Sequence, residues 1–149
     1  YGMDLAPQEF QIKMNILFNL NKDKGVIHNG RQNAKTILQE KQKSTFHLYP
    51  SNCDSEIDCI SVRESVVVGL LPILSTFGIF QERLGVHIPC KSQVEIATKE
   101  YQERVAERVI ELLDSSSELD RERGKIRTKL HENPELSWSD VAEKWMEFL

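Results

Sequence analysis

Two carboxylates, Glu56 and Glu64, have the type and spacing to do chemistry, because they close the two ends of the stretch EIDCISVRE. The apolar run TFHLYP precedes it, so the pattern predicts a strand, a loop and the start of a helix. Open α/β sheets bind ligands beyond the carboxyl ends of their strands, where loop N–H groups and a helix N-terminus favour anions. If the helix begins near Cys59, Glu64 lies about two turns beyond Glu56 and both can face one cleft. A phosphate held between carboxylates that grip hydroxyls is the chemistry of a sugar nucleotide.

The composition is typical of one globular domain. The chain has 149 residues, of which 40% are hydrophobic and 28% are charged, and its formal net charge is −4. That length can bury a core without disulfides, and the acidic balance gives no basic footprint for nucleic acid. No apolar run approaches the roughly 20 residues of a membrane-spanning helix. We therefore expect a cytoplasmic protein, with a peripheral position at a membrane as the alternative, and no nucleic acid as a partner.

The cysteines and histidines do not predict a metal site. The cysteine spacing matches no zinc pattern, and an odd cysteine count is typical of a reducing compartment. A redox pair at Cys53 and Cys59 is the alternative, disfavoured because the spacing is not C-x-x-C. We expect structural or surface roles for the histidines. The residues concerned are Cys53, Cys59, Cys90, His28, His47, His87 and His131.

Helix and strand signals alternate over the first 90 residues. The predicted elements are a strand tail at 1–4, a helix at 8–20, a strand at 25–30, a helix at 32–43, a strand at 45–50, a helix at 59–68, a strand at 71–76, a helical turn at 78–85 and a strand at 86–89. In the helix at 32–43 we expect Ala34, Ile37 and Leu38 to point inward. The run LPILST is apolar throughout, as a buried parallel strand should be.

The last third of the chain is helical in pattern. Ser92 and Glu95 form a capping-box signature, and apolar residues then recur at steps of three and four. A polar break, DSSSELD, separates this helix from a charged helix at 119–130. Ser137 and Asp140 begin a terminal helix. The predicted buried stripe is Val94, Ala97, Tyr101, Val105, Val109 and Leu112, and the terminal apolar face is Trp138, Val141, Trp145 and Phe148.

Strands separated by helices predict an α/β fold with a parallel, doubly wound, Rossmann-like sheet. We expect residues 1–90 to form a Rossmann-like core and residues 91–149 to add C-terminal helices that complete the same domain. No G-x-G-x-x-G follows any predicted strand, which disfavours a dinucleotide-dependent dehydrogenase.

The order of strand, E-x7-E loop, helix, Gly, Pro and strand resembles the nucleotide-sugar-binding half of retaining glycosyltransferases with the GT-B fold. The family commonly reads EGFGLTLLEAMAAGLPV here, and this chain reads EIDCISVRESVVVGLLPI. The resemblance covers residues 1–85, and the later segment SWSDVAEKWMEF is similar to the closing helix of the family. It implies transfer of a sugar, with retention, from a nucleotide diphosphate donor to a saccharide or glycoconjugate acceptor.

The resemblance also implies roles by position. Glu56 would contact hydroxyls of the donor sugar at the catalytic face, and Glu64 would bind the ribose hydroxyls. The backbone N–H groups of Cys59, Ile60 and Ser61 would hold the diphosphate. Gly30 and Arg31 would lie at the base pocket. We expect no cofactor and no metal, because no D-x-D motif appears and helix N–H groups can neutralise the diphosphate.

The chain departs from the family pattern at Ile57 and Asp58, at Cys59, and at Arg63, which is polar where the family is usually apolar. Asp58 adds a negative charge beside the expected diphosphate, so we expect it to point away, and Cys59 stands where the pattern has Gly. The first strand of this half, with its diphosphate-binding Arg and Lys, and the acceptor-binding N-terminal half are expected before Tyr1.

A structural role is the alternative for each of the two carboxylates, and a non-catalytic role is the alternative for the domain. Glu56 can be a cap of the following helix, and Glu64 can be a solvated helix residue. The whole domain can be a non-catalytic module that binds a nucleotide or a partner protein.

Overall fold

The computed structural model describes residues 7–133, 139–140, 143 and 146–147. The chain forms two compact units, residues 1–37 and residues 38–149. Within the described ranges, no helix is both long and apolar enough to cross a membrane. The predicted strand tail at 1–4 and the predicted terminal apolar face, which comprises Trp138, Val141, Trp145 and Phe148, lie outside the described residues.

The first unit is built on helix α1, Gln8–Asn21, as the sequence predicted. A 3-10 helix, η2 (Lys22–Lys24), ends it, and Gly25 then adopts a left-handed φ of 87°. No residue of α1 is buried. The apolar side chains of this helix are therefore not part of a packed core within the described residues.

Two predictions in this region are wrong. Residues 26–30 form no strand, because an extended segment needs a hydrogen-bonded neighbour to be stable as a strand and the described part of the unit supplies none. Helix α2 spans Ala34–Lys43, but Ala34, Ile37 and Leu38 are exposed rather than inward. The buried residue of α2 is Lys41, one turn beyond Ile37.

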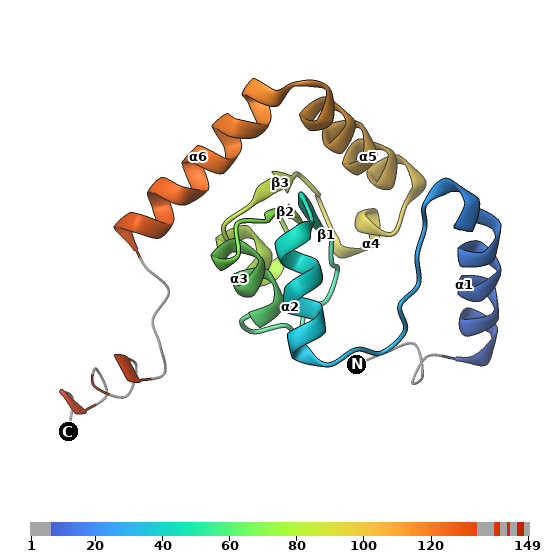
Figure 1. Cartoon of the computed structure of the whole chain (residues 1–149), viewed down its shortest axis with the longest axis horizontal. Helices are drawn as coiled ribbons and strands as arrows, with labels where there is room; N and C mark the ends of the chain where they lie inside the picture. The colour runs from blue at the N-terminus through green and yellow to red at the C-terminus, as the bar shows by residue number, and fades with distance from the viewer. Residues whose placement is uncertain (1–6, 134–138, 141–142, 144–145, 148–149) are drawn as a thin grey trace. The chain divides into compact units, whose positions relative to one another are not determined.

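The second unit contains a three-stranded parallel sheet in the order β1-β2-β3 (Figure 1). The strands are β1 (Phe46–Tyr49), β2 (Leu71–Ser75) and β3 (Val86–Ile88), and Leu48 pairs with Ile73, which pairs with Val86. All three were predicted, and all five residues of β2 are buried. The fold is thus α/β with a parallel sheet and a helical C-terminal region.

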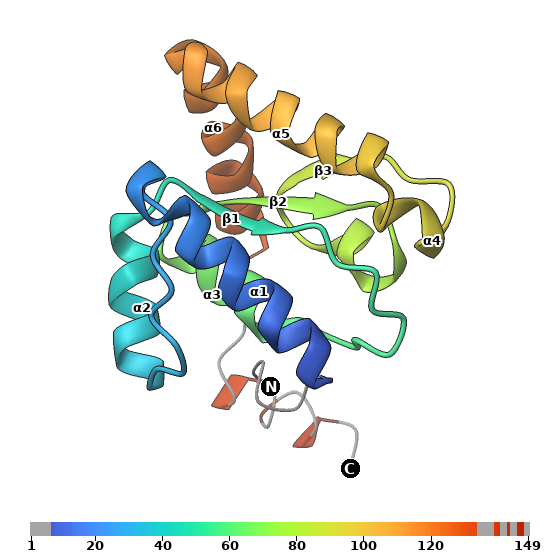
Figure 2. The same ribbon diagram turned by 90° about the vertical axis from the view of Figure 1, so that its right-hand side faces the viewer.

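The two faces of the sheet have separate apolar cores, because side chains alternate along each strand. One face carries Leu71 and Ile73, which pack with Tyr101 and Val105 of helix α5 (Lys99–Asp114). The other carries Leu74, which packs with residues of helix α3 (Ile60–Val67) and the 3-10 helix η3 (Gly78–Glu82). Figure 2 shows α5 and α3 on opposite sides of the strands.

The long helix predicted from Ser92 is interrupted. Helix α4 covers only Gln93–Ile96, and α5 begins after Thr98, whose Oγ1 accepts a hydrogen bond from the Tyr101 N–H at 3.3 Å. This cap starts a new helix axis, so Val94 and Ala97 are exposed, contrary to the predicted stripe. From Tyr101 onward the stripe is confirmed, since Tyr101, Val105 and Leu112 are buried and Val109 packs half-buried against the same core.

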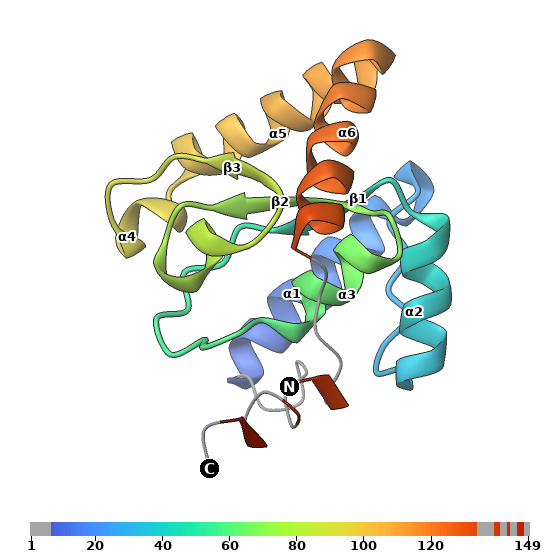
Figure 3. The ribbon, with the colours of Figure 1, turned by 90° about the vertical axis from the view of Figure 1, so that its left-hand side faces the viewer.

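A second charged helix follows α5 after a turn at Ser115 (Figure 3). This helix, α6, covers Ser116–Glu132 and has one buried residue, Ile126. Its first turn is capped by the Ser115 hydroxyl, which accepts from the Glu118 N–H at 3.3 Å. The sequence predicted the charged character of the helix but placed its start three residues too late.

Pro72 has no backbone N–H to donate, and it lies in the central strand at a position where no neighbouring strand needs that donor. The Leu71 N–H donates to Thr45 O on the β1 side, so the next nitrogen faces the β3 side, where β3 starts only at Val86. Gly85 passes so close that an added Cβ would lie 2.8 Å from Pro72 O. Glycine at position 85 thus permits β3 to approach the proline.

We expect Gly85→Ala to destabilise the fold by about 1–3 kcal/mol, because backbone atoms would have to shift to accept the methyl group. Urea unfolding followed by circular dichroism measures this change. The matched control is Gly124→Ala in α6, where nothing lies within 4 Å of the added Cβ. That change should stabilise the helix by about 0.5–1 kcal/mol. A stable Gly85→Ala protein would disprove the close approach.

Candidate functional site

The start of α3 lies where a loop leaves the carboxyl end of β1. Cys59, the residue before α3, has a φ of 52° and a ψ of 63°, which is left-handed and uncommon for a residue other than glycine. Its side chain is 2% exposed and packs with Val62, Leu74 and Phe80. The predicted helix start near Cys59 is confirmed, and the side chain in the core holds the strained turn in place.

Glu56 folds back onto this turn. Its Oε1 accepts a hydrogen bond from the Cys59 N–H at 2.9 Å. A carboxylate at the N-terminus of a helix satisfies a free donor and interacts favourably with the helix dipole. The contact is the capping role that the sequence left open for Glu56. A contact with a donor sugar stays a prediction.

Glu64 is held by a buried lysine. Lys41 Nζ donates to Glu64 Oε2 at 2.9 Å, to Ser61 Oγ at 3.0 Å and to Ser61 O at 2.7 Å. An ammonium group has three donors, so all three are used. The Lys41 side chain is 9% exposed, whereas that of Glu64 is 46% exposed. Lys41 therefore fixes one side of the Glu64 carboxylate, and the other side is open to solvent.

A histidine and a serine continue this polar network beneath α3. Ser65 Oγ donates to Ser61 O at 2.8 Å, so its lone pairs accept from the Nδ1–H of His47, also at 2.8 Å. Burial, and then the positive charge of Lys41, lower the pKa of His47 from 6.5 to about 4. His47 is thus neutral near pH 7 and ties β1 to α3.

Asp58 joins two loops at the same edge of the sheet. It accepts from Arg63 of α3 at 2.7 Å and forms an ion pair with Arg83, just after η3, at 3.3 Å. Because α3 follows β1 and η3 follows β2, the pairs connect the segments beyond two neighbouring strands. The expectation that Asp58 turns away from a phosphate is not tested by these contacts.

The predicted residues of the second unit come together at the first turns of α3. Ile60 and Ser61 are the first helical residues, whose N–H groups have no partner four residues back in the helix. Gly30, with a left-handed φ of 61°, and Arg31 belong to the first unit. Their assignment to a base pocket stays a prediction.

Lys41 was missed by the sequence analysis, although one signal could have found it. The spacing from Ile37 to Lys41 is four residues, so the lysine falls on the helix face that was predicted to be inward. A charged residue on such a face needs a partner of opposite charge. That requirement points to a carboxylate elsewhere, but the sequence does not say which one.

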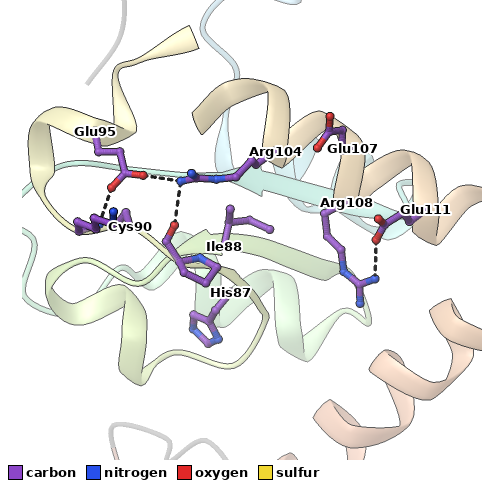
Figure 4. Close-up of a pocket in the computed structure, with 10 residues that line it drawn as sticks. His87, Ile88, Cys90, Glu95, Arg104, Glu107, Arg108 and Glu111 are labelled. Atoms are coloured by element: carbon purple, nitrogen blue, oxygen red, sulfur yellow. Dashed lines mark hydrogen bonds and ion pairs between the residues drawn. The ribbon is translucent and has the colours of Figure 1, made fainter. Parts of the chain in front are cut away.

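A groove of about 540 Å³ lies between β3 and the outward face of α5 (Figure 4). Arg104, in this groove, binds Glu95 at 2.6 Å and Pro89 O at 3.1 Å. Arg108 binds Glu111 at 3.0 Å, and Glu118 lies 2.8 Å away. Both guanidinium groups are therefore already neutralised, and the groove offers neither to an anionic ligand.

Comparison of the chain with models of protein families, with curated proteins and with solved structures found no match. Among the described residues, no group of three or more His, Cys, Asp or Glu side chains could hold a metal ion.

The acid sensitivity of the fold should depend on His47. Since its pKa is 6.5 when unfolded and about 4 when folded, the unfolded chain binds more protons between these values, and stability falls as the pH falls through that window. Above it, histidine is neutral in both states. We expect His47→Gln to lose less stability than the wild type between about pH 7.5 and about pH 4.5 in urea unfolding. His131→Gln, at an exposed position, is the control, and equal losses in all three proteins would contradict the assignment.

The left-handed turn at Cys59 predicts an unusual order of stabilities. Both Cys59→Gly and Cys59→Ala remove the buried sulfur, but only glycine accepts this φ without strain. Cys59→Gly should therefore be more stable than Cys59→Ala by about 1 kcal/mol, which reverses the usual order of the two residues. Thermal unfolding of the two variants measures the difference. A more stable alanine variant would show that the turn is not left-handed in solution.

Proposed function

We propose that this chain is the donor-binding part of a retaining glycosyltransferase with the GT-B architecture, and that its sheet belongs to a Rossmann-like domain. The backbone of Cys59 carries the proposal. Its φ of 52° favours glycine, and the family pattern EGFGLTLLEAMAAGLPV has glycine at that position. The E-x7-E spacing does not by itself require a left-handed residue at this position. The left-handed φ of Cys59 is therefore a second point of agreement with the family pattern, separate from the two glutamates.

The position of the turn supports phosphate binding. It lies at the carboxyl end of β1, beside the parallel strand β2, where open α/β sheets bind their ligands. The N–H groups of Ile60 and Ser61 open an eight-residue helix, and its dipole favours an anion at this end. A diphosphate gains negative charge as it leaves the sugar, so fixed donors at this place would lower the barrier.

The Glu64 carboxylate suits a ribose. A carboxylate has about four lone-pair sites that accept hydrogen bonds, and Lys41 donates to one of them at Oε2. The remaining sites can accept the two hydroxyl hydrogens of a cis-diol. Because Lys41, which is itself held by Ser61, fixes the carboxylate before any ligand arrives, little rotamer freedom would be lost on binding.

Glu56 would contact the donor sugar. Its contact with the Cys59 N–H places the carboxylate at the same turn as the proposed diphosphate site. A sugar joined to that diphosphate would have its hydroxyls within reach of this loop. The acceptor would be bound by a further domain.

A non-catalytic module is the second candidate. The observation that favours it is that Glu56 caps α3 and Glu64 pairs with Lys41, so each carboxylate already has a structural contact. Binding of a nucleotide without a sugar preference would support this reading. Binding of one nucleotide sugar more tightly than its nucleotide would support the transferase.

We expect the chain to bind one of UDP, GDP or ADP, or a sugar conjugate of it, in a saturation-transfer NMR screen. Glu64→Ala should weaken that binding by at most a few kcal/mol, because about two hydrogen bonds to a charged acceptor are lost. Glu64→Gln, which keeps an oxygen for Lys41, separates loss of charge from loss of the fold. Calorimetry measures the affinities.

Glu100→Ala, at an exposed glutamate of α5, is the control and should bind like the wild type. Unchanged affinity in both Glu64 variants would refute the ribose assignment. No binding of any nucleotide or nucleotide sugar would refute the donor site.

A further inference from the structure

The buried ammonium group of Lys41 connects two residues that the proposed donor site uses. Its Nζ donates to Ser61 O at 2.7 Å, to Ser61 Oγ at 3.0 Å and to Glu64 Oε2 at 2.9 Å. Two of these contacts are made to one residue, so Ser61 fixes the place of the ammonium group. The third contact then fixes the place of the Glu64 carboxylate. Lys41 belongs to α2, whereas both of its partners belong to α3.

The position of Lys41 is unfavourable for a charge. Its side chain is 9% exposed, and the loss of hydration in a buried ion pair can exceed the attraction between the two charges. A flexible apolar side chain such as methionine would join α2 to α3 by packing, without that loss. Contact between two helices therefore does not explain the charge. The exposed side of Glu64 does, because a ligand can reach the carboxylate that the charge holds.

A carboxylate with a fixed orientation binds a diol differently from a free one. Two neighbouring hydroxyls reach two acceptor sites together only when the plane of the carboxylate faces them. A free glutamate gives up rotamer freedom each time it adopts that orientation. A carboxylate held in place has already done so, and each hydroxyl then contributes more to binding. A ligand that lacks one of the hydroxyls is therefore rejected more strongly.

Lys41 also makes the carboxylate compatible with a phosphate ligand. Glu64 lies on the same helix as the proposed diphosphate site, and an unpaired carboxylate there would repel the diphosphate. The ammonium group balances that charge from the protein side. The free oxygen of Glu64 still accepts hydrogen bonds from neutral hydroxyls. The ion pair thus allows a carboxylate to bind the sugar of a polyanionic ligand.

We propose that Lys41 is a positioning residue that sets the ribose specificity of the donor site. It acts through Glu64 and does not itself bind the ligand. By holding the carboxylate in one orientation, Lys41 makes the site prefer a ribonucleotide to the matching 2′-deoxyribonucleotide. The inference rests on the proposed function for the identity of the ligand, whereas the hold of Lys41 on Glu64 can be tested in the free protein.

The alternative is that Lys41 only ties α2 to α3. The two interpretations differ in what the loss of the charge does to specificity. A structural tie supports the whole site, so its removal would weaken the binding of ribonucleotides and deoxyribonucleotides by the same factor. A positioning residue that acts on Glu64 changes the ratio of the two affinities, because Glu64 is the group that contacts the hydroxyls.

The free protein supplies the first test. Three-bond NMR couplings report the rotamers of a glutamate side chain. We expect Glu64 to have one dominant rotamer in the wild type and averaged rotamers in Lys41→Met. Glu100, an exposed glutamate of α5, should be averaged in both proteins and serves as the internal reference. A Glu64 side chain that is averaged in the wild type would overturn the proposal, and so would one that stays fixed in Lys41→Met.

The second test is a calorimetric titration with UDP, GDP and ADP and with their 2′-deoxy forms. For the nucleotide that binds, we expect the wild type to prefer the ribose form by about tenfold or more, because one hydrogen bond to a charged acceptor is lost with the hydroxyl. Lys41→Met should reduce that preference to about threefold or less. Lys41→Arg keeps a cation at this place and should recover part of the preference.

Two further variants show whether Lys41 acts through Glu64. Lys43→Met removes the same charge from an exposed position of α2, where Lys43 pairs with Glu40, and should keep the wild-type preference. Glu64→Ala should have no ribose preference, and adding Lys41→Met to it should leave the ratio of affinities unchanged, as for two residues that act as a unit. Circular dichroism verifies that each variant is folded.

The outcomes separate this inference from the proposed function. Nucleotide binding with a ribose preference that Lys41→Met leaves intact would overturn the role of Lys41 and leave the donor site standing. Equal weakening of both forms by Lys41→Met would show that the lysine is only a structural tie. No binding of any nucleotide by the wild type would refute the donor site and its ribose specificity together.

Discussion

Strand β2 has neighbours on both edges and is buried along its whole length, so both of its faces need an apolar cover. Helix α5 supplies one cover, and α3 with η3 supplies the other. A parallel strand also needs a crossover to reach its neighbour, and α3 is that crossover. Burial of β2 thereby fixes where α3 begins, and with it the loop that holds Glu56 and Cys59.

The polar groups beneath α3 set a second constraint. Lys41 enters the protein interior with its charge, and a buried charge must be paired. Its partners, Ser61 and Glu64, lie on one side of α3, and the Ser65–His47 hydrogen bond joins the same helix to β1. The helix is therefore held by apolar contacts on the sheet and by the Lys41–Glu64 ion pair at its flank.

The sequence predicts elements well where local pattern and burial agree. The apolar run of β2, the alternation around it and the glycine after α3 all favour one structure, and the structure has it. The predicted strand at 25–30 is wrong, because a strand depends on a partner strand that local residues do not reveal. The helix break before Thr98 was not predicted, because the threonine cap interrupts an apolar spacing that is otherwise continuous. For the site, the start of α3 follows from the sequence, whereas the Lys41–Glu64 pair joins residues 23 apart and depends on how α2 and α3 meet.

Burial of Cys59 also bears on the response of the protein to oxidants. Thiolates, rather than thiols, react with oxidants, and burial raises the pKa of Cys59, so its sulfur stays protonated near neutral pH. Cys53, six residues earlier, is exposed and would meet an oxidant first. An oxidant can thus modify Cys53 in the loop while the Cys59 thiol stays reduced. The turn before α3 then keeps its structure when the redox state of the surroundings changes.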